Sequence, residues 1–149
     1  HRIVADLLRL GIDVPSVYRR IYANIPYDDL RLLASIYPTM QRDADGKIAW
    51  FTIRKQLLAG HPRLSIDLGE SVLAFGRSLK DVQVVLLFKE NLARDNEVRV
   101  NFRSQGAVDV NRIAGIFGGG GHKTASGATI KGPVERVRRA VLAEVKKAL

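Results

Sequence analysis

Four consecutive glycines lie directly before His122 and Lys123, within the stretch RIAGIFGGGGHKTASGATIKG that runs from Arg112 to Gly132. Glycine loses more conformational entropy on ordering than any other residue, so such a run is expected only where the backbone needs positive φ or a close approach. Backbone N–H groups without a neighbouring Cβ atom can bind phosphate oxygens, and the lysine and histidine add a charge and a donor. The run therefore indicates an anion-binding loop, with a hinge or a tight crossover between a helix and a strand as the structural alternative.

This glycine run differs from the phosphate loop of nucleoside triphosphatases. In that loop, G-x-x-x-x-G-K-[ST], the lysine directly follows a glycine, whereas Lys123 follows His122. ATP binding of that kind is therefore disfavoured. If the amides of the run close on a phosphate, a Cβ atom at Gly120 is expected both to strain the backbone and to obstruct the ligand.

A second basic element precedes the glycines, where NFRSQG (Asn101 to Gly106) places Arg103 and Ser104 at the end of an expected strand. The guanidinium group of arginine is a planar fork that matches a phosphate group or a base edge. Taken alone, Arg103 is better explained as a surface charge. If both segments lie at one end of a sheet, Arg103 and Ser104 converge with His122 and Lys123, and this convergence favours a binding site.

Other residue sets that perform chemistry are missing or have a simpler explanation. A two-metal hydrolase needs several carboxylates and histidines that converge on the ions, and the three histidines of the chain have no aspartate at ligand spacing. His61, in GHPR, is interpreted as a surface residue of a turn, and Asp28 and Asp29, in YDD, as residues that begin a helix. The chain has no cysteine and no serine in a G-x-S-x-G context. We therefore expect no metal or cofactor in this chain and no complete active site.

The charge of the chain favours polyanionic partners. Its 149 residues include 24 Lys and Arg against 15 Asp and Glu, a formal net charge of +9. A net positive charge of this size favours binding of nucleotides, RNA or DNA, although many of these charges would serve solubility alone. No apolar run is long enough to cross a membrane, no signal peptide is evident, and the lack of cysteine suits a reducing compartment. A cytoplasmic protein without membrane contact is the expectation.

Hydrophobic periodicity predicts the elements that position these residues. Residues 1–38 predict three helices, and Asp-Gly in DADG (Asp43 to Gly46) predicts a hairpin rather than a calcium loop. The near-continuous apolar run VQVVLLF predicts a central strand, and VRVNF predicts a strand with one polar face. Further segments predict helices at 68–79, 110–117 and from 133 onward, and a strand at 126–131. The expected class is α/β (α+β), with a mixed sheet of about five strands flanked by helices and preceded by a helical linker.

Two motifs, GGGGHKTASG and VRVNFRSQGAVDVNRIAGIFGG, resemble the C-terminal DHH-associated domain of the DHH phosphoesterase family. They are most similar to the branch with bifunctional oligoribonuclease and adenosine bisphosphate phosphatase activity. In this resemblance, residues 1–38 correspond to the helical end of the catalytic domain and its linker, and residues 39–149 to the substrate-binding associated domain. Because the chain starts at His1, inside a helical pattern, it is expected to be a fragment.

The resemblance implies a larger N-terminal domain of the same protein that carries the Asp-His-His motif and two divalent ions, usually manganese. The parent protein would hydrolyse short oligoribonucleotides in the manner of an exonuclease, or 3'-phosphoadenosine 5'-phosphate, or both. This chain alone would be inactive and would bind the nucleotide end of the substrate. The residues implied in substrate binding are Arg103, Ser104, Gly118, Gly119, Gly120, Gly121, His122 and Lys123.

His122 is also the candidate for a catalytic role in the intact protein. Asn101 and Gln105 depart from the small or basic residues expected beside Arg103, which puts the contact to the base in doubt.

Three alternatives remain open at this point. The first is a noncatalytic RNA-binding module similar to the associated domain of alanyl-tRNA synthetases. The second is a cyclic-dinucleotide phosphodiesterase, and single-stranded DNA is a further candidate substrate. The third is a structural dimerisation domain, which leaves a homodimer as a further expectation.

Overall fold

The computed structural model describes residues 1–59 and 67–149, so the interpretation of His61 lies outside the described residues. The chain begins with three helices, α1 (Arg2–Arg9), α2 (Val14–Tyr22) and α3 (Tyr27–Ile36), followed by a short 3-10 turn at Tyr37–Thr39. Asp28 and Asp29 lie in the first turn of α3, as predicted.

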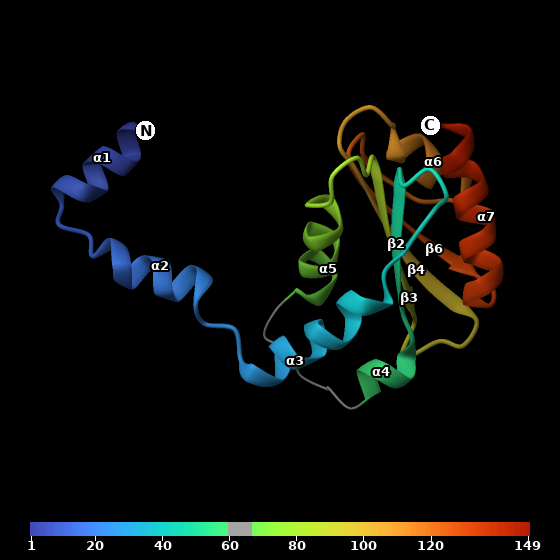
Figure 1. Cartoon of the computed structure of the whole chain (residues 1–149), viewed down its shortest axis with the longest axis horizontal. Coiled ribbons are helices and arrows are strands. Elements are labelled where there is room, and N and C mark those ends of the chain that lie inside the picture. Colours follow the sequence, from blue (N-terminus) through green and yellow to red (C-terminus); the bar gives the residue numbers. More distant parts are fainter. Residues whose placement is uncertain (60–66) are drawn as a thin grey trace.

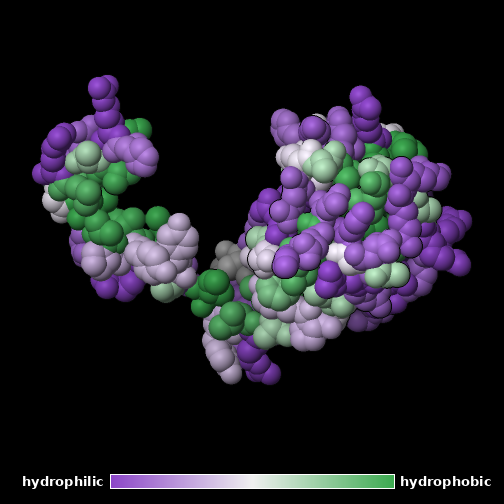
Figure 2. Space-filling view, turned by 45° about the horizontal axis from the view of Figure 1, so that its top comes forward, coloured by the Kyte–Doolittle hydropathy of each residue, from purple (hydrophilic) through white to green (hydrophobic). Residues whose placement is uncertain are grey.

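Helices α1 and α2 extend away from the rest of the molecule (Figure 1) and bury none of their residues. Most of the apolar residues that predicted these helices are exposed; Ile3, for example, keeps 76% of its surface accessible. Figure 2 shows this hydrophobic surface along the N-terminal segment. Helix α3, in contrast, buries Leu32, Leu33 and Ile36 in the body of the molecule.

A six-stranded mixed sheet with the order β1-β2-β3-β4-β6-β5 forms the body. Its strands are β1 (Gln41–Arg42), β2 (Ile48–Ile53), β3 (Val84–Glu90), β4 (Glu97–Ser104), β5 (Gly120–His122) and β6 (Ala125–Lys131). Strands β2 and β3 are parallel, whereas every other neighbouring pair is antiparallel. The mixed α/β fold is thus confirmed.

Individual strands agree with the expectations with one exception. The hairpin of β1 and β2 turns at Gly46, whose φ of +69° suits the Asp-Gly turn. Strand β3 lies between β2 and β4 and buries five successive residues, as its apolar run predicted. Strand β5 was not predicted, because half of the glycine run, expected as a loop, pairs with β6.

Helices cover the two faces of the sheet unequally (Figure 1). The helices of the body are α4 (Lys55–Ala59), α5 (Leu68–Arg77), α6 (Val110–Ile116) and α7 (Val134–Lys147). Helices α6 and α7 form one core with apolar residues of β2, β3, β4 and β6. On the other face, α3 and α5 pack on β2 and β3, and among the described residues this second core contains none from β4, β5 or β6. Among the described residues, no helix packs on this face of β6 and β5, and α5 reaches β4 where Glu70 pairs with Arg103.

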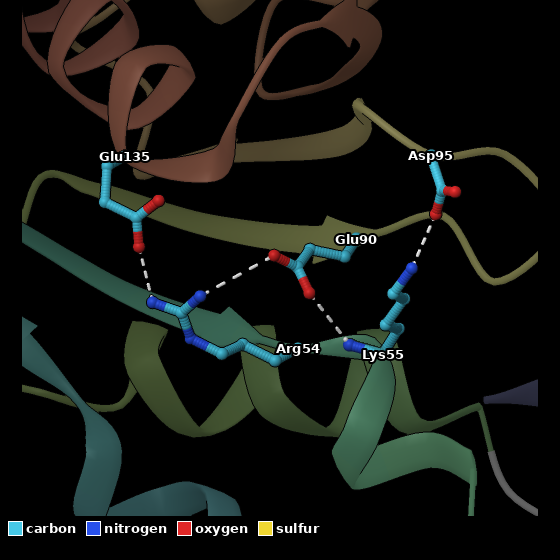
Figure 3. Close-up of polar contacts among 5 residues, drawn as sticks. All are labelled: Arg54, Lys55, Glu90, Asp95 and Glu135. Carbon is cyan, nitrogen blue, oxygen red and sulfur yellow. Dashed lines mark hydrogen bonds and ion pairs between the residues drawn. The ribbon is translucent and has the colours of Figure 1, made fainter.

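An ion-pair network joins the end of β2 to the start of α7 (Figure 3). The guanidinium group of Arg54 contacts the carboxylates of Glu135 and, at 3.7 Å, of Glu90. The backbone N–H of Lys55 donates to Glu90 at 3.0 Å, and the Lys55 ammonium pairs with Asp95. Hydrogen bonds from Arg54 and Lys55 lower the pKa of Glu135 and of Asp95, respectively. This network lies at the end of β3 opposite to the end that faces Ser104, so it is separate from the glycine run.

Candidate functional site

The first two glycines of the run end helix α6. Gly118 has a φ of +72°, and its N–H donates to the carbonyl of Gly115 at 3.0 Å. The N–H of Gly119 donates to the carbonyl of Ala114 at 2.9 Å. This pair of bonds is the Schellman motif that satisfies the last carbonyls of a helix. The amides of Gly118 and Gly119 are thus occupied within the chain.

The last three glycines of the run differ in the space that their surroundings leave for a Cβ atom. A Cβ atom on Gly119 would lie 2.3 Å from the carbonyl oxygen of Gly127, and Gly121 combines a φ of +149° with a Cβ position 2.5 Å from the carbonyl oxygen of Ala125. Gly120 is different, because its φ lies outside the left-handed region and its Cβ position meets only Asn111 Oδ1, at 3.7 Å. The prediction that a Cβ atom at Gly120 would strain the backbone is therefore wrong. The fold accounts for the other three glycines but not for this one.

The end of β4 and the turn between β5 and β6 lie side by side, which is the arrangement that a common binding site of the two segments requires. Arg103 is paired with Ala125, which is paired with His122 across the next ladder. The backbone N–H of Ser104 donates to the carbonyl of Thr124 at 3.0 Å, directly beyond Lys123. The structure thus brings the two predicted segments to one end of the sheet.

The predicted side chains at this end have different environments. His122 and Lys123 are exposed. The side chain of Arg103 is 18% exposed, and its Nη2 atom contacts Glu70 Oε2 on α5 at 2.7 Å. Ser104 is buried, and its hydroxyl donates to the carbonyl of Val108 at 2.7 Å. Ser104 therefore shapes the turn after β4 from inside the fold and does not present its hydroxyl at the surface.

Gln105 also belongs to the fold. Its side-chain amide donates to the carbonyls of Arg77 and Val82, at 3.1 and 2.9 Å, and so ties the end of α5 to the start of β3. Asn101, in contrast, lies on the face of β4 opposite to the core of α6 and α7. Of the two departures noted beside Arg103, Asn101 shares a sheet face with Arg103, whereas the exposed Gln105 is held by its two hydrogen bonds.

The uncovered sheet face carries a group of polar and small side chains that we name the polar strip. Because directly paired residues of neighbouring strands share a face, the register defines its members. These are Arg99, Asn101 and Arg103 of β4, Ala125, Gly127 and Thr129 of β6, and Gly120 and His122 of β5. The strip lies beside α5, with Arg103 and His122 in one row at its end.

Arg99 is the member of the polar strip that the motif analysis missed. Its guanidinium group lies over Gly127, where a Cβ atom would be 2.6 Å from Nη2, and its Nη1 atom donates to the Thr129 hydroxyl at 3.3 Å. Within the described residues, no carboxylate pairs with it. The alternation of VRVNF, which placed Arg99 and Asn101 together on the polar face, was the signal that could have found it.

The described part of the chain offers no group of three or more His, Cys, Asp or Glu side chains that could hold a metal ion. Nor does any helix in residues 1–59 and 67–149 have the length and apolar character needed to cross a membrane. The polar strip offers cationic side chains, an amide, an imidazole and an open approach to the backbone at Gly120, and each of these can contact an anion.

Comparisons with known proteins point to one family. The sequence model of the DHHA1 domain matches residues 66–149. The bifunctional oligoribonuclease and PAP phosphatase NrnA of Thermus thermophilus is 45% identical over 154 residues, which cover 99% of this chain and 44% of that protein. The protein of the same name from Mycoplasma genitalium is 29% identical, over 86% of this chain and 46% of that protein. This chain thus spans less than half the length of these curated relatives.

Two solved structures share the fold. An exopolyphosphatase-related protein from Bacteroides fragilis superposes with a TM-score of 0.82 at 26% identity, over 97% of this chain and 43% of that chain. A pGpG-specific phosphodiesterase from Vibrio superposes with a TM-score of 0.58 at 10% identity, over 81% of this chain and 40% of the other. The second similarity concerns the fold alone.

Proposed function

The chain belongs to the DHHA1 domain family, and from this premise we propose that it is the nucleotide-binding part of a metal-dependent DHH-family phosphoesterase. The substrates we propose are short oligoribonucleotides, 3'-phosphoadenosine 5'-phosphate, or both. The names of the relatives from Thermus thermophilus and Mycoplasma genitalium, an oligoribonuclease and PAP phosphatase, support this choice.

A single observation carries the proposal at the level of residues, namely the row that joins Arg103, Ala125 and His122 on the uncovered sheet face. A phosphate group bound at this row would accept hydrogen bonds from the guanidinium and imidazole groups, while Lys123 adds positive charge beside them. Gly120 lies in the neighbouring row, where the absence of a Cβ atom lets the ligand approach the backbone.

In this proposal the chain binds and orients, and the bond-breaking groups belong to another domain. Two divalent ions, usually manganese, would activate a water molecule and stabilise the charge on the phosphate there. The described residues of this chain include no cluster that could hold such ions. Positioning alone can account for a large part of a rate enhancement, because it converts a bimolecular encounter into an intramolecular one.

Hydrolysis assays on two forms of the protein test this proposal. With Mn²⁺, the full-length protein that contains this chain is expected to hydrolyse a diribonucleotide and 3'-phosphoadenosine 5'-phosphate, and the 149-residue chain to hydrolyse neither. Turnover by the chain alone would contradict the proposed division of roles. If the full-length protein bound RNA without hydrolysing it, the noncatalytic RNA-binding module would be the better account.

A further inference from the structure

We propose that Arg99 forms a second phosphate subsite, which extends the binding site along β4 away from the row of Arg103 and His122. The inference rests on the proposed function, since it concerns the same polar strip, and it adds a preference for ligands with more than one backbone phosphate. Its first support is charge. Arg99 is exposed and has no carboxylate partner among the described residues, whereas Arg103 is paired with Glu70 at 2.7 Å.

The difference in pairing has a consequence for binding. A phosphate group at Arg103 must share the guanidinium group with Glu70. The negative charge of Glu70 therefore weakens the attraction between Arg103 and the phosphate. At Arg99 the described residues supply a hydroxyl contact of 3.3 Å, with Thr129, and no carboxylate that would compete with a phosphate group. When a ligand anchored at the row of Arg103 and His122 extends along β4, Arg99 is therefore expected to add salt-dependent affinity.

The second support is the position of the guanidinium group. Gly127 lies in the interior of β6, where glycine weakens a strand and marks a close approach. A Cβ atom at this position would lie 2.6 Å from Nη2 and 3.0 Å from Cζ of Arg99. Glycine thus leaves room for the arginine to lie across β6 and to point along the strip toward the row of Gly120 and Asn101.

The third support is spacing. Arg99 and Arg103 are four residues apart on one strand, so both lie on the same face, with Cα atoms separated by about 13–14 Å. The inclination of Arg99 over Gly127 brings its charged end closer to Arg103 than this distance. Two arginines on one face of a strand can contact two different phosphates of one extended single strand, with the amide of Asn101 between them to meet a sugar or a base.

Binding of oligoadenylates of two lengths to the 149-residue chain tests the subsite. ApA has one phosphate and ApApApA has three, so only the longer ligand can occupy both subsites. Arg99→Gln is expected to weaken the tetranucleotide about 10-fold and the dinucleotide less than about 2-fold. For the tetranucleotide, the slope of log K against log salt should also fall by about 0.7. Arg139→Gln on α7, an exposed residue of the helix that covers the opposite face, is the control for loss of one positive charge.

A second variant tests the position of Arg99 without changing the charge. Gly127→Ala forces only the flexible end of the arginine to move, because the nearest backbone atom, the carbonyl oxygen of Val100, lies 3.4 Å from the new Cβ position. It is expected to weaken the tetranucleotide selectively, and in the double variant with Arg99→Gln to add nothing further.

The possible results separate the two proposals. Equal effects of Arg99→Gln on both ligands, or an effect no larger than that of Arg139→Gln, would overturn the second subsite while leaving the proposed function intact. If the wild-type chain bound neither ligand, the proposed function would fail together with the inference.

Discussion

Gly119→Ala is expected to lower the free energy of unfolding by about 2–3 kcal/mol, the cost typical of atoms forced into a packed site. The new methyl group would meet the carbonyl oxygen of Gly127 at 2.3 Å and the Cβ atom of Ala128 at 2.6 Å. Neither neighbour can move aside easily, because both belong to the central part of β6. Urea denaturation of the 149-residue chain measures the effect.

Gly120→Ala is the matched control from the same glycine run. Its Cβ position meets only Asn111 Oδ1 at 3.7 Å and its φ is permitted for alanine, so stability should change by less than about 0.5 kcal/mol. Oligonucleotide affinity should nevertheless fall, because the methyl group would project from the polar strip and obstruct the ligand. If both variants lost stability equally, Gly120 would also be required by the fold, and its assignment to ligand approach would be wrong.

His122→Ala is expected to reduce kcat of the full-length protein about 100-fold, the loss typical of one charged or hydrogen-bonding group at a reacting phosphate. The melting temperature should stay unchanged, because the side chain is exposed and the backbone of His122 makes the contacts that hold the turn. It pairs with Ala125, and its carbonyl accepts a hydrogen bond from the Ser126 hydroxyl at 2.8 Å. Steady-state hydrolysis of a diribonucleotide with Mn²⁺, together with thermal denaturation, measures both quantities.

Lys123→Ala provides the comparison for His122→Ala. As an exposed neighbouring charge, Lys123 is expected to affect KM and the salt dependence rather than kcat. If His122→Ala left kcat unchanged, the histidine would have no catalytic role and would be a binding residue. If activity and melting temperature fell together, the turn would instead have a structural role.

The sequence was informative where one periodicity dominated a segment. The alternation of Val98, Val100 and Phe102 with polar residues predicted β4 and its two faces, and the apolar run 82–88 predicted the central strand β3. Asp-Gly predicted the first hairpin through its turn chemistry. These signals are local, so no knowledge of the remaining chain was needed to interpret them.

The rest depends on contacts between distant segments. Strand β5 consists of Gly120, Gly121 and His122, which have low strand propensity, and it exists because β6 offers an edge to pair with. The partner of Arg103, Glu70, lies 33 residues earlier on α5. The motif favoured Arg103, whereas in the described part of the chain Arg99 is the arginine of the same strip that has no carboxylate partner. Ser104 was likewise assigned to the site by its place in a motif, although its hydroxyl donates to the carbonyl of Val108 inside the fold.

Backbone amide shifts in the ¹⁵N-labelled chain, followed during titration with ApApApA, test the central claim most directly. That claim is that the polar strip and the turn beside it bind the nucleotide. The largest changes are expected at Arg99, Arg103, Gly120, His122 and Gly127, with the amides of α7 unchanged because this helix covers the other sheet face. Changes concentrated on α7, or on the ion-pair network around Glu90, would contradict the account.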